Sequence, residues 1–160
     1  MTKARGLADL GNAYDDGALS NRNMIINGAM RVNARGTQTG IGSNSYFVDR
    51  FQIVLTDEGS YTLSQADDAP SGSGFTKSAK LEITTADTSI AATDYAQMRY
   101  RFENQDVKHL MKGTANAKAI TLSFWVKSSL AQDFKLRIRD NNSSTSRQTI
   151  KSYTIASANT

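Results

Sequence analysis

The chain of 160 residues contains no cysteine, one proline (Pro70) and one histidine (His109). Without cysteine it has no disulfides, no thiolate metal ligands and no cysteine nucleophile. One histidine excludes a histidine-rich metal site within a single chain, and nothing around His109 is typical of a catalytic triad. The sequence therefore predicts neither a metal site of these kinds nor a cofactor.

Long apolar runs are also missing. No stretch approaches the ~20 apolar residues that a membrane-spanning helix requires, so no membrane insertion is predicted. Lys3 and Arg5 resemble the charged start of a secretory signal, but residues 6–20 are small and polar, with only scattered leucines. Because no apolar core segment follows the charges, we expect no signal peptide.

The sequence lacks carboxylates arranged for catalysis. Glycoside hydrolysis uses two carboxylates held across a cleft on rigid elements, whereas residues adjacent in a turn tend to point apart. The acidic pairs all lie in turn-rich sequence, where Asp caps the backbone: Asp15-Asp16, Asp57-Glu58 and Asp67-Asp68. We therefore expect no enzymatic activity. Calcium held by carbonyl groups and distant carboxylates remains an open alternative.

Apolar and polar residues alternate with a period of two over most of the chain, which is typical of strands with one buried face. We expect strands within residues 24–32, 51–56, 61–63, 79–84, 95–102, 120–127, 134–139 and 150–155. The turn-rich residues 57–60 predict a hairpin between two of them. The apolar spacing in residues 105–112, followed by Gly113, predicts one or two helical turns. These features predict a mainly β fold, an antiparallel β-sandwich or jelly roll with one short helix.

The predicted strand over residues 120–127 contains the only tryptophan. Its apolar residues are expected to face the core: Ile120, Leu122, Phe124 and Val126. Trp125 lies in the opposite, polar register. A covering loop, a subunit contact or sugar stacking each accounts for it, and we favour the subunit contact because tryptophan is enriched at interfaces.

Basic residues are concentrated on the polar faces of the later predicted strands: Arg99, Arg101, Lys127, Lys135, Arg137 and Arg139. If these strands are neighbours, they form a cationic sheet face. Such a face is either solvated and balanced by nearby acids or binds a polyanion. Single-stranded nucleic acid usually needs several interleaved aromatics, which are scarce here, so no nucleic-acid partner is predicted. The candidate interface or glycan contacts are Trp125, Arg99, Arg101, Arg137 and Arg139.

Residues 1–23 form a separate segment, because they carry too few apolar residues to fold alone. One interpretation is a disordered terminus. The other is an arm that becomes ordered against a partner protein, preceding a β domain over residues 24–160. On that interpretation the residues expected to make the contact are Lys3, Arg5, Leu7 and Leu10.

Several motifs occur in a characteristic order: "NRNMIINGAMRVNARGT", "YFVDRFQI", "TTADTSIAATDYAQMRYRFENQ", "LSFWVKSS" and "YTIASANT". In this order they resemble a domain of tail fibres and tail-spike-like proteins of tailed phages, over most of residues 21–160. The opening "KARGLADLGN" resembles the N-termini of fibres from podovirus-like phages. The resemblance implies a jelly roll similar to carbohydrate-binding modules. It also implies a homotrimeric structural protein of the virion tail that takes part in adsorption to host surface polysaccharide.

In that family the pattern continues past the motif that ends at Thr160, so we expect further chain after it. Residues 1–23 are expected to bind a tail adaptor, nozzle or other tail protein. The alternative is a carbohydrate-binding module of a secreted polysaccharide-degrading enzyme. Secretion requires export, so the expected lack of a signal peptide favours the tail fibre.

Overall fold

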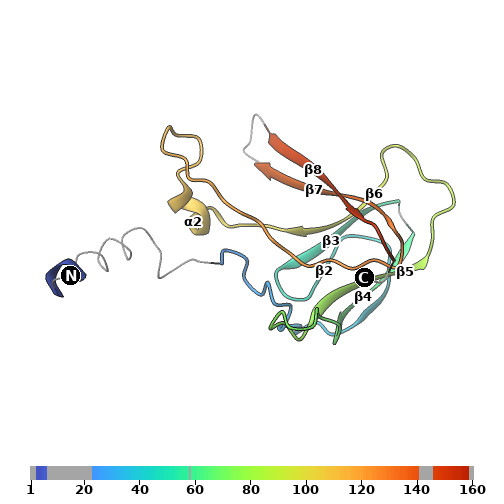
Figure 1. Cartoon of the computed structure of the whole chain (residues 1–160). Coiled ribbons are helices and arrows are strands. Elements are labelled where there is room, and N and C mark those ends of the chain that lie inside the picture. Colours follow the sequence, from blue (N-terminus) through green and yellow to red (C-terminus); the bar gives the residue numbers. More distant parts are fainter. Residues whose placement is uncertain (1–2, 7–22, 58, 141–145, 159–160) are drawn as a thin grey trace. The chain divides into compact units, whose positions relative to one another are not determined.

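A computed structural model describes residues 3–6, 23–57, 59–140 and 146–158 (Figure 1). The fold is mainly β, with antiparallel pairing in every sheet and, among the described residues from 23 onward, one short helical segment, as the sequence predicted. The chain divides into two compact units, residues 1–119 and residues 120–160. Each unit is described by itself below.

Two three-stranded antiparallel sheets form the first unit. One sheet has the order β1 (Gln38–Ile41), β4 (Ser60–Ala66), β5 (Ser78–Thr85). The other has the order β2 (Ser45–Phe47), β3 (Phe51–Thr56), β6 (Tyr95–Tyr100). In the second sheet Phe51 lies opposite Tyr100, and Gln52 lies opposite both Tyr46 and Arg99. Since opposed residues share a face, Tyr46, Gln52 and Arg99 form one row across the sheet.

The core of this unit is a single cluster of buried side chains contributed by both sheets. Its members are Phe47, Val48, Phe51, Ile53, Leu55, Tyr61 and Leu63. Phe47, Ile53 and Leu63 are completely buried and come from three different strands. The alternation within β3 and β4 thus places one apolar face of each strand in the core, which is how a β-sandwich is stabilised.

The predicted strand over residues 24–32 is wrong. Residues 26–29 form turns, and Asn27 and Met30 have φ values of 59° and 55°. A positive φ cannot occur within a regular strand, so the apparent alternation of Ile26, Met30 and Val32 does not correspond to a face. Ile25 and Met30 instead pack against the core cluster from a loop. Two short strands that we did not predict, β1 and β2, follow this loop.

The predicted hairpin across residues 57–60 is also wrong, because β3 and β4 belong to different sheets. The segment between them is a corner at which the chain crosses from one sheet to the other. Asp57 and Gly59 have φ values of 50° and 75°. A Cβ atom at residue 59 would overlap the carbonyl oxygen of Thr85 at the end of β5, so only glycine fits this approach.

The predicted helical turns are confirmed. They consist of α2 (Asn104–Val107) followed by a 3-10 turn, η1 (Lys108–Leu110). Leu110 is buried, whereas His109 is exposed, as expected of a surface histidine. Met111 then adopts a left-handed conformation, with φ 49°, and its N–H donates to the Lys108 carbonyl at 3.1 Å.

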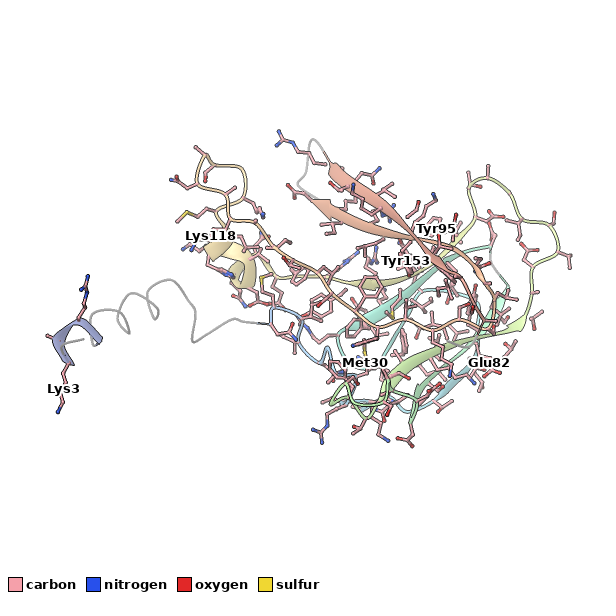
Figure 2. All side chains as sticks on the ribbon, in the orientation of Figure 1. Lys3, Met30, Glu82, Tyr95, Lys118 and Tyr153 are labelled. Carbon is pink, nitrogen blue, oxygen red and sulfur yellow. The ribbon has the colours of Figure 1, made fainter. Side chains whose placement is uncertain are left out.

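The second unit contains one hairpin, β7 (Gln132–Asp140) paired with β8 (Arg147–Ile155), drawn in orange and red in Figure 1. Phe134 stacks on Tyr153, with ring centroids 5.7 Å apart, and Phe124 meets the edge of Tyr153 at 5.5 Å. Tyr153 is labelled in Figure 2. These three rings hold residues 120–127 against the hairpin.

Residues 120–127 do not form the predicted strand. The alternating pattern is present, but a strand also needs a hydrogen-bonding neighbour, and this segment, which is fully described, joins no sheet. Ile120, Leu122, Phe124 and Val126 are 37–47% exposed, so they are not core residues of the unit. Trp125 in the opposite register is 69% exposed.

Candidate functional site

The site of interest begins at the turn between β2 and β3, where backbone conformations are unusual. Val48 is completely buried and has a φ of 22°, and Arg50 has a φ of 81°. A β-branched residue with positive φ is a genuine outlier, and such conformations persist only where the surroundings enforce them. The contacts of Asp49 and Arg50 show how this turn is enforced.

Asp49 connects the turn to the preceding loop. Its Oδ2 accepts a hydrogen bond from the Ala34 N–H at 2.8 Å, and its Oδ1 accepts one from Nη1 of Arg35 at 2.8 Å. Its own N–H donates to the carbonyl of Val32 at 3.1 Å. One aspartate therefore fixes residues 32–35 against the turn through both its side chain and its backbone.

Asn27 completes this connection from the other side. Its Nδ2 donates to the carbonyl oxygens of Val32 and Asp49 at 2.9 and 3.0 Å, and its Oδ1 accepts from the Val32 N–H at 3.0 Å. Asparagine tolerates the left-handed conformation that residue 27 adopts. Both polar atoms of the side chain are thus used to close the loop.

Arg50 extends from the turn to the segment after β6. Its Nη1 donates to Oε1 of Glu103 at 2.8 Å, and its guanidinium carbon lies 5.8 Å from the centroid of the Tyr100 ring. The hydrogen bond to Glu103, with a further contribution from Tyr100, raises the pKa of Arg50 above its ordinary value. The hydroxyl oxygen of Tyr100 accepts a hydrogen bond from the Ile26 N–H at 2.9 Å. These contacts define where the Arg50 and Glu103 side chains lie.

A shallow hollow of about 170 Å³ lies beside this ion pair, lined by Tyr46, Arg50, Arg101 and Glu103. Tyr46 is 43% exposed, and the guanidinium carbon of Arg35 lies 5.7 Å from the centroid of its ring. Arg35 and Arg50 are each paired with a carboxylate, Asp49 and Glu103 respectively. Arg101 is exposed and has no hydrogen bond or ion pair within the described part of the chain.

This arrangement can bind a small polar molecule. It offers an aromatic ring, a cation that no described carboxylate pairs with, and a carboxylate with capacity to accept further hydrogen bonds. Among the described residues the hollow contains one carboxylate, Glu103, which is engaged by Arg50. A hydrolytic site for glycosides ordinarily needs two carboxylates with different roles.

Each candidate residue from the sequence has its own place in the structure. Lys3 (Figure 2) and Arg5 are exposed in the helical turn of residues 3–6, whereas Leu7 and Leu10 lie outside the described residues. Arg99 donates from Nη2 to Oε1 of Gln52 at 2.6 Å across the second sheet. Arg101 follows β6 and lines the hollow.

The remaining candidates belong to the second unit. Arg137 and Arg139 lie on the polar face of β7, and Nη2 of Arg139 donates to Oγ of Ser146 at 2.9 Å. Trp125 is 69% exposed. The continuous cationic sheet does not form by strand pairing, because β6 pairs with β3 whereas β7 pairs with β8. Their roles as interface or glycan contacts stay predictions.

Sequence reasoning missed Tyr46, Arg50 and Glu103 as lining residues. Their signal was present in the quoted motifs, since "YFVDRF" contains Tyr46 and Arg50, and "YRFE" contains Glu103. The pairing of Phe51 with Tyr100 brings the two motifs together, and this register was not readable from either motif alone.

Within the described ranges, no group of three or more His, Asp or Glu side chains is placed to hold a metal ion. In the same residues, no helix combines the length and apolar character needed to cross a membrane. Comparisons of the chain with models of protein families, with curated proteins and with solved structures gave no match.

Proposed function

We propose that the chain is a structural subunit of a phage tail fibre, homotrimeric in the virion, that takes part in adsorption to the host surface. Residues 1–23 bind a tail adaptor, nozzle or other tail protein, with Lys3, Arg5, Leu7 and Leu10 in the contact. The β units follow as a module between the tail and the receptor-reading end. The protein is located in the virion tail.

One observation supports this proposal above the others. The residues that carry the family resemblance are distant in sequence, yet Asn27, Asp49, Arg50, Tyr100 and Glu103 form one connected set of contacts. A shared domain architecture accounts for these contacts, because the motifs then preserve the residues that fix the loops of the module.

The second candidate is a carbohydrate-binding module of a secreted polysaccharide-degrading enzyme. The exposed rings of Tyr46 and Trp125 favour it, because aromatic faces stack on sugar rings. The two candidates predict different partners: a tail protein for a fibre, and a covalently linked catalytic domain for a binding module. Both agree in predicting no hydrolysis by these 160 residues.

The deciding experiment is structure determination of assembled particles of a phage whose genome encodes the chain. We expect three copies at each attachment point on the tail, with residues 1–23 in contact with a tail protein. Particles that lack the chain, or attachment points that hold one copy or two, contradict the proposal.

A separate assay tests the expected absence of catalysis. Purified protein is incubated with host polysaccharides, and newly formed reducing ends are measured. We expect none above the level given by heat-denatured protein. Release of saccharide that is abolished by Glu103→Gln would overturn the assignment as a non-enzymatic protein.

A further inference from the structure

We propose that the hollow lined by Tyr46, Arg50, Arg101 and Glu103 binds a carboxylate-bearing sugar ring, such as a hexuronic acid residue of an acidic polysaccharide. Only the source of the sugar, the host surface, rests on the function proposed above. The binding itself follows from the chemistry of the four side chains.

The charge balance of the hollow favours one negative charge on the ligand. Arg35 is paired with Asp49 and Arg50 with Glu103, both with oxygen–nitrogen distances of 2.8 Å. Arg101 adds a positive charge that no described carboxylate neutralises. A guanidinium presents a planar fork of donors that matches a carboxylate, so Arg101 binds the acid group of the ligand through two parallel hydrogen bonds.

Glu103 selects against more highly charged anions. Its carboxylate lies in the wall of the same hollow and is 51% exposed, so a phosphate monoester, which carries more negative charge than a carboxylate, is repelled. Oε1 of Glu103 accepts from Arg50 and Oε2 accepts from Gln105 at 3.1 Å. Each oxygen has a second lone pair, which accepts a hydroxyl hydrogen from a sugar.

Tyr46 supplies the apolar part of the site. One side of a pyranose ring presents C–H groups that pack on an aromatic face, and Tyr46 is 43% exposed. Strand pairing of Tyr46 with Gln52 fixes the position of its backbone, and the guanidinium of Arg35 near the ring holds the side chain. The ligand therefore meets a platform that is already in place, which reduces the entropy lost on binding.

The size of the hollow fits one sugar ring of a polysaccharide. Pockets that enclose a drug-sized molecule have volumes of roughly 300–1,000 Å³, whereas this hollow has about 170 Å³ and is open to solvent. An open hollow lets the polysaccharide continue on both sides of the bound ring. Affinity for one ring is weak, and several copies of the chain in a trimer raise it through multivalency.

The test uses the purified chain and tetragalacturonate, with binding followed by isothermal titration and by NMR shifts of the protein. The same oligosaccharide with its carboxyl groups reduced to alcohols is the uncharged comparison. We expect the acidic form to bind at least about tenfold more tightly, the ratio given by one good charge-assisted contact. Equal binding of the two forms, or no binding of the acidic form at millimolar concentration, overturns the proposal.

Variants assign the binding to the hollow. Arg101→Gln should weaken binding of tetragalacturonate about tenfold, whereas Arg31→Gln, which removes the same charge from an exposed residue outside the hollow, should leave it unchanged. Tyr46→Ala should weaken both forms of the oligosaccharide, and Tyr46→Phe should retain binding. Equal effects of Arg101→Gln and Arg31→Gln would indicate attraction by net charge and contradict the assignment.

A single-stranded oligonucleotide tests the competing class of polyanion. If it binds as tightly as tetragalacturonate and with the same loss on Arg101→Gln, the hollow does not select a carboxylated sugar and the proposal is wrong. The binding results do not bear on the proposed fibre role, which is tested by counting copies of the chain in the assembled particle. Failure of the sugar-binding proposal can therefore be told apart from failure of the fibre proposal.

Discussion

Asn27 shows how one side chain can determine a loop. Its amide donates to two carbonyl oxygens, those of Val32 and Asp49, and accepts from the Val32 N–H. The left-handed φ of 59° at this residue is unfavourable for most side chains. The hydrogen bonds offset that cost, so the loop and the β2–β3 turn depend on an amide rather than on any other small polar group.

Replacing the amide by a carboxylate tests this dependence. Asn27→Asp keeps the size of the side chain but directs a second oxygen at two carbonyl oxygens, with loss of both donated hydrogen bonds. We expect the free energy of unfolding to fall by about 1–3 kcal/mol, measured by urea denaturation at neutral pH. Asn23→Asp is the matched control, because within the described residues Asn23 uses only its Oδ1, which accepts from Ile25 N–H at 3.0 Å. Equal losses at the two positions would contradict the role of the donors.

Alanine substitutions at two glycines distinguish the cost of backbone strain from the cost of steric overlap. Gly59 and Gly72 have nearly the same φ, 75° and 74°, so alanine meets the same backbone penalty of about 1–2 kcal/mol at both. Around Gly72 there is open space, whereas a Cβ at residue 59 meets the Thr85 carbonyl and comes within 3.0 Å of the Asp87 nitrogen.

We therefore expect Gly72→Ala to lower the free energy of unfolding by no more than about 2 kcal/mol and Gly59→Ala to lower it clearly more. Thermal and urea unfolding of the two variants give the comparison. The larger loss follows because the end of β5 must shift to accommodate the methyl group. If the two variants lose the same stability, residue 59 is not the close corner between the two sheets that the structure describes.

At the scale of elements, alternation identified the strands whose faces differ most. β5, β6 and β7 were all predicted, since each alternates apolar and polar residues over at least five positions. The short strands β1 and β2, of four and three residues, are too brief to show a period. In the loop of residues 24–32, apolar and polar residues alternate by chance. Its course is determined by hydrogen bonds to Asp49, a residue of a different segment.

The hairpin of the second unit gives a pH-dependent prediction. Partial burial, with Phe134 stacked on it, raises the pKa of the Tyr153 phenol above its ordinary value of about 10. Folding therefore favours the neutral phenol. The stability that the neutral phenol contributes is fully present below the ordinary pKa. It is lost as the pH rises through the higher pKa of the phenol in the folded state.

We expect the hairpin to lose stability as the pH rises above about 10, and Tyr153→Phe to lose less over the same interval because it has no phenol to ionise. The measurement is far-ultraviolet circular dichroism during thermal unfolding at each pH. Both proteins carry the same other titrating groups, so the difference between their curves isolates Tyr153. Parallel curves for the two proteins would show that ionisation of this phenol does not affect the fold.

At the scale of the whole molecule, the sequence predicted the class of fold and one lining residue of the hollow. Arg101 was a candidate because of its basic neighbours, and it lines the hollow. Tyr46, Arg50 and Glu103 join it only through the pairing of β2, β3 and β6, which brings together residues up to 57 positions apart. Such a site depends on register, and register is set by the core rather than by the residues of the site.

The N-terminal segment provides the last prediction, which concerns the assembled particle. The core cluster of the first unit begins at Ile25 among the partly buried residues, and none of residues 3–6 contributes to it. Removing residues 1–22 leaves Asn23, whose Oδ1 accepts the hydrogen bond from Ile25 N–H. We therefore expect the shortened protein to unfold at the same temperature as the full chain, because every described core contact remains.

The same deletion should abolish incorporation into phage tails, measured by immunoblotting of purified particles made with the shortened gene. The expected loss follows from the proposed contact of Lys3, Arg5, Leu7 and Leu10 with a tail protein. Alanine at Lys3 and Arg5 together is the finer variant, since it removes two exposed charges and leaves the length of the segment unchanged. Normal incorporation of the shortened chain would place the attachment elsewhere, whereas a lowered unfolding temperature would show that the segment stabilises the β domain instead.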